Sequence, residues 1–246
     1  MNQEVLLQFD HVGLAYKRLL KPFAPKSWVL KDISFELYRG EVLGVIGKNG
    51  AGKSTLLKLL ADIIAPDKGE VIRPKSLNAQ MLSLNLGFNP NLSGYDNATM
   101  SLVGLGKSIR EARECMPAII EFSGIDELME YPVKTLSAGE KARLGFSIAM
   151  QATPDILLLD EILGVGDKDF RKKSSDALKE RVQSNQTAVL VSHQPSVLQQ
   201  FCNRVLWIEN GQVKMLSEAE KVLCAYEKYQ ANKTQNGGIQ KKSEAV

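Results

Sequence analysis

One glycine-rich segment constrains the fold more than any other part of this sequence. Residues 47–55 read Gly-Lys-Asn-Gly-Ala-Gly-Lys-Ser-Thr, which satisfies the pattern G-x-x-x-x-G-K-[ST]. The apolar run before it, residues 42–46, is typical of a buried strand, and residues 56–61 after it are typical of a helix. Glycines in such a turn let backbone N–H groups point at one anion, and the following helix adds its positive dipole end. The segment therefore predicts a phosphate-binding loop; a glycine-rich turn before an ordinary helix is the alternative interpretation.

The chemistry of this loop predicts a role for each fixed side chain. We expect Lys53 to reach the β- and γ-phosphates of a nucleoside triphosphate and the Ser54 hydroxyl to bind Mg²⁺. The complete set of expected nucleotide contacts in the loop is Gly47, Lys48, Asn49, Gly50, Ala51, Gly52, Lys53, Ser54 and Thr55.

A second apolar run ends in two carboxylates. Residues 155–160 suit a central parallel strand that is buried on both faces, and ligands collect at the carboxyl ends of such strands. We expect Asp160 to support Mg²⁺ and Glu161 to polarise the attacking water as a base. The alternative is a pair of surface acids after a strand.

The segment at residues 136–140, Leu-Ser-Ala-Gly-Glu, predicts a helix start. Ser137 and Glu140 have the S-x-x-E spacing of a capping box. A helix N-terminus is also an anion site, so a structural and a binding role can hold together.

The same segment resembles the Leu-Ser-Gly-Gly-Gln signature of ATP-binding cassette proteins. The order of phosphate loop, signature, acidic strand end and His193 is also that of this family, and the resemblance covers about residues 5–225. It implies an α/β fold with a P-loop NTPase core, an antiparallel β subdomain and an α-helical signature subdomain at about 88–152. The resemblance places the ATP-binding domain at 1–229; the composition of residues 230–246 predicts a mobile polar tail.

The resemblance also implies a shared site between two subunits. Cassettes of this family close head to tail, so Ser137, Ala138 and Gly139 would contact the γ-phosphate held by the partner subunit. The sequence departs from the family pattern at two positions. Ala138 is a small change, which would cause strain only if a left-handed backbone is required there. The charge of Glu140 argues for a side chain directed away from nucleotide.

Three further positions resemble functional positions of the family. His193, at the end of a strand at residues 187–192, resembles the switch histidine that contacts the γ-phosphate; a structural histidine is the alternative. Asp167 resembles the aspartate that crosses the dimer interface, although it also suits the cap of the next helix. Tyr16 resembles the aromatic residue that stacks on adenine, with a buried core tyrosine as the competing interpretation.

Two other stretches narrow the resemblance. Residues 87–97 and 160–167 resemble stretches of bacterial polysaccharide exporters. This implies a homodimeric ATPase subunit that uses ATP and Mg²⁺ to drive polysaccharide or glycolipid export through a separate permease. The alternatives are a soluble cassette ATPase that remodels a macromolecular complex, and the ATPase subunit of a transporter for another substrate.

Composition adds expectations about partners and compartment. Lys and Arg total 31 against 28 Asp and Glu, a net charge of +3 that gives no reason to expect a nucleic-acid partner. The three cysteines, Cys115, Cys202 and Cys224, are widely spaced, which predicts free thiols in a reducing compartment. With no signal peptide or spanning segment expected, the resemblance implies a cytoplasmic protein bound to the inner face of the cytoplasmic membrane.

The remaining pattern predicts the other elements. We expect a loop-dominated joint at residues 77–97. The further expected elements are a broken strand at 5–16, a strand at 28–37, helices at 108–122, 138–151, 170–184 and 218–230, and a hairpin at 205–214.

Overall fold

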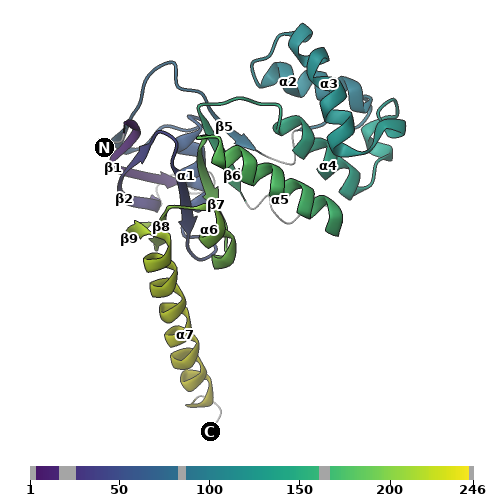
Figure 1. Ribbon diagram of the computed structural model, residues 1–246. Helices are drawn as coiled ribbons and strands as arrows, with labels where there is room; N and C mark the ends of the chain where they lie inside the picture. The colour runs from purple at the N-terminus through teal and green to yellow at the C-terminus, as the bar shows by residue number, and fades with distance from the viewer. Residues whose placement is uncertain (1–3, 17–25, 83–86, 161–166, 244–246) are drawn as a thin grey trace. The chain divides into compact units, whose positions relative to one another are not determined.

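The computed structural model describes residues 4–16, 26–82, 87–160 and 167–243. The chain divides into two compact units. The first combines residues 1–75 with residues 189–246, and the second comprises residues 76–188. The elements form the mixed α/β fold that the sequence predicts (Figure 1).

The first unit is built on a mixed sheet. Its strands follow the order β4 (Lys68–Ile72), β1 (Val5–Tyr16), β2 (Ser27–Tyr38), β9 (Gln212–Glu218), β8 (Arg204–Glu209), β3 (Val42–Ile46) and β7 (Thr187–Val191). β1 pairs antiparallel with both β2 and β4, whereas β3 pairs parallel with β8. The unit therefore joins an antiparallel part to a parallel part, as predicted.

The expected break in β1 is present at His11. This residue has a φ of 48°, and the register with β2 shifts between Phe9 and Val12. A positive φ disfavours most L-residues, so the strand bends where the sequence pattern is interrupted.

The predicted hairpin is also confirmed. β8 and β9 pair antiparallel, and the turn residues Asn210 and Gly211 have φ values of 52° and 78°. Two consecutive positive φ angles are what a tight Asn-Gly hairpin turn requires. β9 extends to Glu218, beyond the predicted end of the hairpin at residue 214.

Every residue of β3 is buried, as expected for a strand covered on both faces. Helices α1 (Lys53–Leu60), α6 (Pro195–Phe201) and α7 (Ala219–Ser243) complete the first unit. A Cβ atom on Gly44 would lie 2.9 Å from Val205 Cγ2 and 3.2 Å from Leu198 Cδ2, so glycine lets α6 approach β3 closely. Helix α6 was not predicted.

The second unit contains a strand pair and a group of helices. β5 (Ala79–Leu82) pairs parallel with β6 (Ile156–Asp160). The helical elements are α2 (Gly94–Gly104), α3 (Ile109–Ser123), η1 (Asp126–Leu128), η2 (Val133–Thr135), α4 (Ala138–Ala149) and α5 (Lys168–Gln183). α2, α3 and α4 enclose a core of their own that includes Leu102, Met116, Ile119, Leu144 and Ile148.

The prediction for residues 77–97 is partly wrong, because β5 and the start of α2 lie there. β5 is stabilised by pairing with β6, a contact between residues far apart in the sequence. α2 begins at a local signal that the prediction did not use: Asp96 N donates to Ser93 Oγ over 3.1 Å. The end of α7 also differs, since the helix continues to Ser243 rather than ending at residue 230. The polar residues after 230 lack an apolar period, but a helix needs only favourable backbone geometry to continue.

None of the helices in the described ranges is both long enough and apolar enough to cross a membrane.

Candidate active site

The phosphate-binding loop lies between β3 and α1, in the predicted strand–loop–helix arrangement. Gly50 and Gly52 have φ values of 78° and 106°, which side-chain-bearing residues rarely adopt. A Cβ atom on Gly47 would lie only 2.3 Å from the carbonyl oxygen of Ile208. Glycine is therefore needed at these positions for different reasons. Gly50 and Gly52 allow the loop to turn, and Gly47 allows the loop to lie directly against β8.

Lys53 is the first residue of α1, and its side chain folds back across the loop. The residue is 7% exposed, and Nζ donates to the carbonyl oxygens of Gly47 at 2.8 Å and Lys48 at 3.1 Å. The Lys48 carbonyl also accepts from Ala51 N at 3.1 Å. These bonds fix the ammonium group above the first turn of the loop. A cation that binds phosphate has to be held in place in this way.

The neighbouring loop residues differ in exposure. Ser54 is exposed at the first turn of α1, whereas Thr55 faces the interior. Asn49 is exposed, and Lys48 is partly buried. The Ser54 hydroxyl is thus accessible at the helix N-terminus, where an anion and its counterion would gather.

His193 lies at the same edge of the first unit's sheet as the phosphate loop. β7 ends at Val191 beside β3, and Ser192 N donates to Val45 O over 3.4 Å. Val45 precedes the loop by two residues, so the ends of the two strands bring residue 193 towards the loop. The His193 residue itself is exposed.

Tyr16 is the last residue of β1 and is 46% exposed. This exposure excludes the interpretation of Tyr16 as a buried core tyrosine. A half-exposed ring offers a face on which a planar group can stack.

In the second unit, the predicted capping box at the start of α4 is confirmed. Glu140 N donates to Ser137 Oγ over 3.2 Å, and Ser137 N donates to Glu140 Oε2 over 2.7 Å. The bond from the Ser137 N–H lowers the pKa of the Glu140 carboxyl. The carboxylate therefore turns back onto its own helix end, as expected if it does not contact nucleotide.

Ala138 is the first residue of α4 and is not among the described residues with positive φ. A left-handed backbone is therefore not required at Ala138, and the alanine causes no such strain. At Gly139 a Cβ atom would meet only the Ser137 hydroxyl, at 3.9 Å, so the start of the helix is open.

Two predicted site residues of the second unit, Asp160 and Asp167, lie at the ends of elements. Asp160 ends β6 and is partly buried, whereas the four strand residues before it are buried. Asp167 caps α5, because its Oδ1 accepts from Phe170 N at 2.9 Å. This bond from the Phe170 N–H lowers the pKa of the Asp167 carboxyl. Glu161, predicted to be the base, lies outside the described residues.

Sequence reasoning did not identify Arg143. This residue lies on α4 three positions after Glu140, and its Nη1 is 3.8 Å from Asp167 Oδ2. The ion pair joins the signature helix to the cap of α5. Helical spacing predicts that Arg143 and Glu140 share a face, but only the fold brings Asp167 to them.

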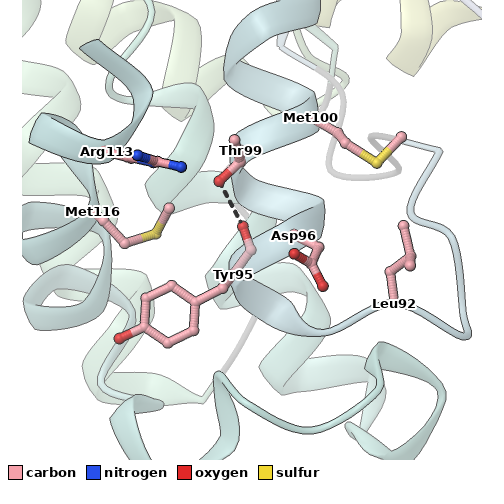
Figure 2. A pocket seen from close by; sticks show the side chains of 7 residues that line it. All are labelled: Leu92, Tyr95, Asp96, Thr99, Met100, Arg113 and Met116. Atoms are coloured by element: carbon pink, nitrogen blue, oxygen red, sulfur yellow. Dashed lines mark hydrogen bonds between the residues drawn. The ribbon is translucent and has the colours of Figure 1, made fainter. Parts of the chain in front are cut away.

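A separate cavity of about 680 Å³ lies on the second unit. Figure 2 shows its lining from α2 and α3, with Thr99 Oγ1 donating to the Tyr95 carbonyl over 2.9 Å. The lining residues are Leu92, Tyr95, Asp96, Thr99, Met100, Arg113 and Met116. None of the predicted nucleotide contacts is among them.

Comparisons with known proteins agree with this geometry. The profile of the ABC transporter family matches residues 30–164. The chain is 40% identical over 222 residues to the teichoic acids export ATP-binding protein TagH of Shouchella clausii, covering 87% of this chain and 61% of that protein. It is 36% identical to TagH of Bacillus anthracis, covering 93% of this chain and 43% of the relative. The chain thus spans less than two thirds of these two relatives.

Shorter relatives and solved structures match over most of their length. The O-antigen export system ATP-binding protein RfbB of Klebsiella pneumoniae is 38% identical over 233 residues, which are 91% of this chain and 94% of the relative. The dimeric structure of a bacterial ABC transporter cassette has a TM-score of 0.72 at 21% identity, covering 87% of this chain and 99% of that one. At this low identity, the likeness to the solved structure shows the fold alone. By the family profile and these identities, the chain belongs to the ABC transporter family.

Proposed function

We propose that this chain is an ATPase subunit that drives export of a polysaccharide or glycolipid. The observation that carries the proposal is the phosphate loop, in which a buried Lys53 is held by two backbone carbonyls at the end of a buried strand. Because the ammonium is already oriented, little side-chain entropy is lost when triphosphate binds.

The donor atoms of two residues fit Mg²⁺. The Ser54 hydroxyl and the Asp160 carboxylate offer the oxygen ligands that this ion prefers. In the described parts of the chain, no three His, Cys, Asp or Glu residues gather into a metal site. Mg²⁺ commonly binds through one or two protein groups together with substrate phosphates. Bound Mg²⁺ would neutralise charge on the β- and γ-phosphate oxygens.

The remaining residues divide the work of hydrolysis. Backbone N–H groups of the loop and Lys53 hold the phosphates, and Tyr16 stacks on adenine. Glu161 orients the water that attacks the γ-phosphorus, and His193 contacts the γ-phosphate from the end of β7. The bond from the γ-phosphorus to the bridging oxygen breaks, which yields ADP and inorganic phosphate.

A second copy of the chain completes each site in this proposal. The α4 N-terminus, with its capped Ser137 and open Gly139, is suited to contact a γ-phosphate held by the partner subunit. Asp167 contacts the same interface. Support comes from a solved structure with the same fold, a dimeric ATP-binding cassette in a post-hydrolysis state bound to ADP and Pi.

The cargo and the membrane partner follow from the relatives. TagH and RfbB are named for the export of teichoic acids and of O-antigen. The proposed partner is an integral-membrane permease, which would hold this chain at the inner face of the cytoplasmic membrane.

Phosphate release by the purified chain tests the catalytic part of the proposal. We expect Lys53→Ala to lower ATP turnover by at least about 100-fold, since it removes a cation aimed at the transferring phosphate. Lys58→Ala, an exposed lysine on the same helix, is the matched control and should leave turnover unchanged. Normal turnover by Lys53→Ala would contradict the assignment.

Co-purification from membranes tests the transport part. A subunit of an exporter should be recovered with a permease, and its loss should leave polysaccharide inside the cell. Recovery with a large soluble assembly instead, with normal export, would support the remodelling alternative.

A further inference from the structure

The end of β1 that carries Tyr16 is paired less regularly than the middle of this strand. In the described ranges, the last pair between β1 and β4 joins Gly13 to Lys68, so β1 extends beyond its neighbour on this side. On the other side, the register between β1 and β2 shifts immediately before and after Leu14. Such irregularities interrupt the ladder of hydrogen bonds. The strand end can therefore move unless another contact fixes it.

Asp67, the residue before β4, supplies this contact. Its backbone N–H donates to Gly13 O over 2.9 Å, and its Oδ2 accepts from Ala15 N at 2.9 Å. The carboxylate thus takes the place that a backbone carbonyl would have if β4 continued alongside β1. Because the acceptor is charged, its bond with the Ala15 N–H is stronger than an ordinary bond of the ladder.

Two further contacts hold Asp67 in place. Its Oδ1 accepts from Lys26 Nζ at 2.9 Å, and Lys26 directly precedes β2. A Cβ atom on Gly69 would lie 2.2 Å from the carbonyl oxygen of Asp10, so the turn at residues 66–69 lies directly against β1. The backbone of Asp67 is therefore fixed by this turn, and its carboxylate is oriented by a lysine at the start of β2.

Ala15 connects Asp67 to the residue that stacks on adenine in the proposed site. Tyr16 follows Ala15 directly and is 46% exposed. The rotamer of a side chain depends on its backbone dihedral angles. The place of this half-exposed ring is consequently set by the strand end that carries it, and Asp67 holds that strand end.

We propose that Asp67 is a positioning residue for the adenine base of ATP. Its carboxylate holds the Ala15 N–H, and this bond fixes the strand end on which the Tyr16 ring meets adenine. The inference rests on the proposed ATP site. A ring that is already in place loses less freedom when the base stacks on it, so Asp67 strengthens ATP binding and does not act on the chemical step.

A double-mutant cycle tests this role. The whole chain is titrated in a calorimeter with Mg²⁺ and AMP-PNP, an ATP analogue that is not hydrolysed. Tyr16→Ala should raise the dissociation constant about tenfold, since it removes the stack of a base on an aromatic ring. Asp67→Ala should raise it about threefold, because the ring remains but is less well placed. With Tyr16 already replaced, Asp67→Ala should cause no further loss. Fully additive effects, or unchanged binding by Asp67→Ala, would overturn the proposal.

Steady-state kinetics distinguish positioning of the base from damage to the phosphate loop. Asp67→Ala should raise KM for ATP about threefold and leave kcat unchanged, because a contact that holds substrate and transition state equally affects KM alone. Glu70→Ala, which replaces an exposed carboxylate on β4, is the matched control and should change neither constant. If kcat of Asp67→Ala falls as much as KM rises, the residue supports the structure in general and the proposal is wrong.

Conservative variants show which bond of Asp67 matters. Asp67→Asn keeps an oxygen that accepts from Ala15 N, so its dissociation constant for AMP-PNP should stay within about twofold of the wild-type value. Lys26→Met removes only the ion pair. The side chains of Lys26 and Asp67 are 42% and 31% exposed, so this variant should bind as the wild type does. Binding by Asp67→Asn as weak as that of Asp67→Ala would refute the role of the bond to Ala15.

Tyr16→Ala separates the two levels of the argument. If it weakens AMP-PNP binding while Asp67→Ala binds normally, the adenine site stands and the role of Asp67 fails. If Tyr16→Ala itself binds normally, the stacking of adenine on Tyr16 is wrong and the role of Asp67 fails with it, whereas Lys53→Ala still tests the phosphate site. If the wild-type chain does not bind AMP-PNP, both the proposed ATP site and the role of Asp67 fail.

Discussion

Replacement of Gly47 by alanine tests the geometry of the phosphate loop. The added Cβ atom would lie 2.3 Å from Ile208 O and 3.3 Å from Ala51 Cβ. A carbon–oxygen contact needs about 3.3 Å, so the loop or β8 has to move by about 1 Å. Gly47 has no positive φ, and the cost is therefore steric rather than conformational. Overpacking of this kind destabilises a fold by about 1–3 kcal/mol.

The displacement should affect nucleotide binding as well as stability. The Gly47 carbonyl accepts from Lys53 Nζ at 2.8 Å, and a hydrogen bond to a charged group contributes about 1.5–3 kcal/mol. We expect ATP affinity to fall at least about tenfold, which corresponds to about 1.4 kcal/mol. The melting temperature should fall by about 2–10 °C for a chain of this size.

Gly50→Ala is the matched control. Gly50 has a φ of 78°, but a Cβ atom there meets nothing within 4 Å. Its cost is therefore only the left-handed conformation, about 1–2 kcal/mol, with no displacement of β8. Thermal unfolding and nucleotide titration of both variants decide the question. If Gly47→Ala is no more harmful than Gly50→Ala in the two assays, the steric argument is wrong.

Three further predictions follow from buried or capped groups. Asn97→Ala should destabilise the chain by about 2–4 kcal/mol in denaturant unfolding. Asn97 is 2% exposed, and the two N–H groups of its amide are shared among the carbonyl oxygens of Asn89, Leu92 and Ser93, at 2.9–3.1 Å from Nδ2. An unchanged unfolding midpoint would contradict this. The pKa of Glu140 is lowered in the folded chain, so its stabilisation is present above the unfolded value of 4.5 and is lost as pH falls through the folded value. The free energy of unfolding of Glu140→Gln should therefore fall less steeply at acid pH than that of the wild type. If the two free energies fall in parallel as pH is lowered, Glu140 does not contribute to the acid dependence. Burial raises the pKa of Cys202 to about 12, so a maleimide at neutral pH should label the exposed Cys224 and leave Cys202 intact in mass spectrometry; rapid labelling of Cys202 would show otherwise.

Local signals predicted much of the fold. The phosphate loop, the hairpin at Asn210 and Gly211, and the capping box at Ser137 each depend on residue types at fixed spacing, and each is confirmed. Such motifs can be identified in one sequence because the residues that form them are neighbours.

Elements that depend on distant partners were harder to predict. β5 has a short, mixed sequence and is stabilised by pairing with β6, which lies more than 70 residues further along the chain. The ion pair between Arg204 Nη1 and Glu41 Oε1, at 2.9 Å, joins residues across an even longer separation. No periodicity or spacing relates such positions, so only the three-dimensional structure identifies them.

Light scattering of Glu161→Gln tests the central claim most directly, because this variant should bind ATP without hydrolysing it. With ATP and Mg²⁺, the proposal predicts a species with the mass of two chains, and with ADP a species with the mass of one. Adding Ser137→Arg to the variant should return the ATP-bound sample to the mass of one chain, since the α4 N-terminus would no longer accommodate the partner's γ-phosphate. A one-chain mass for Glu161→Gln at saturating ATP would contradict the claim that two copies of this chain enclose the nucleotide.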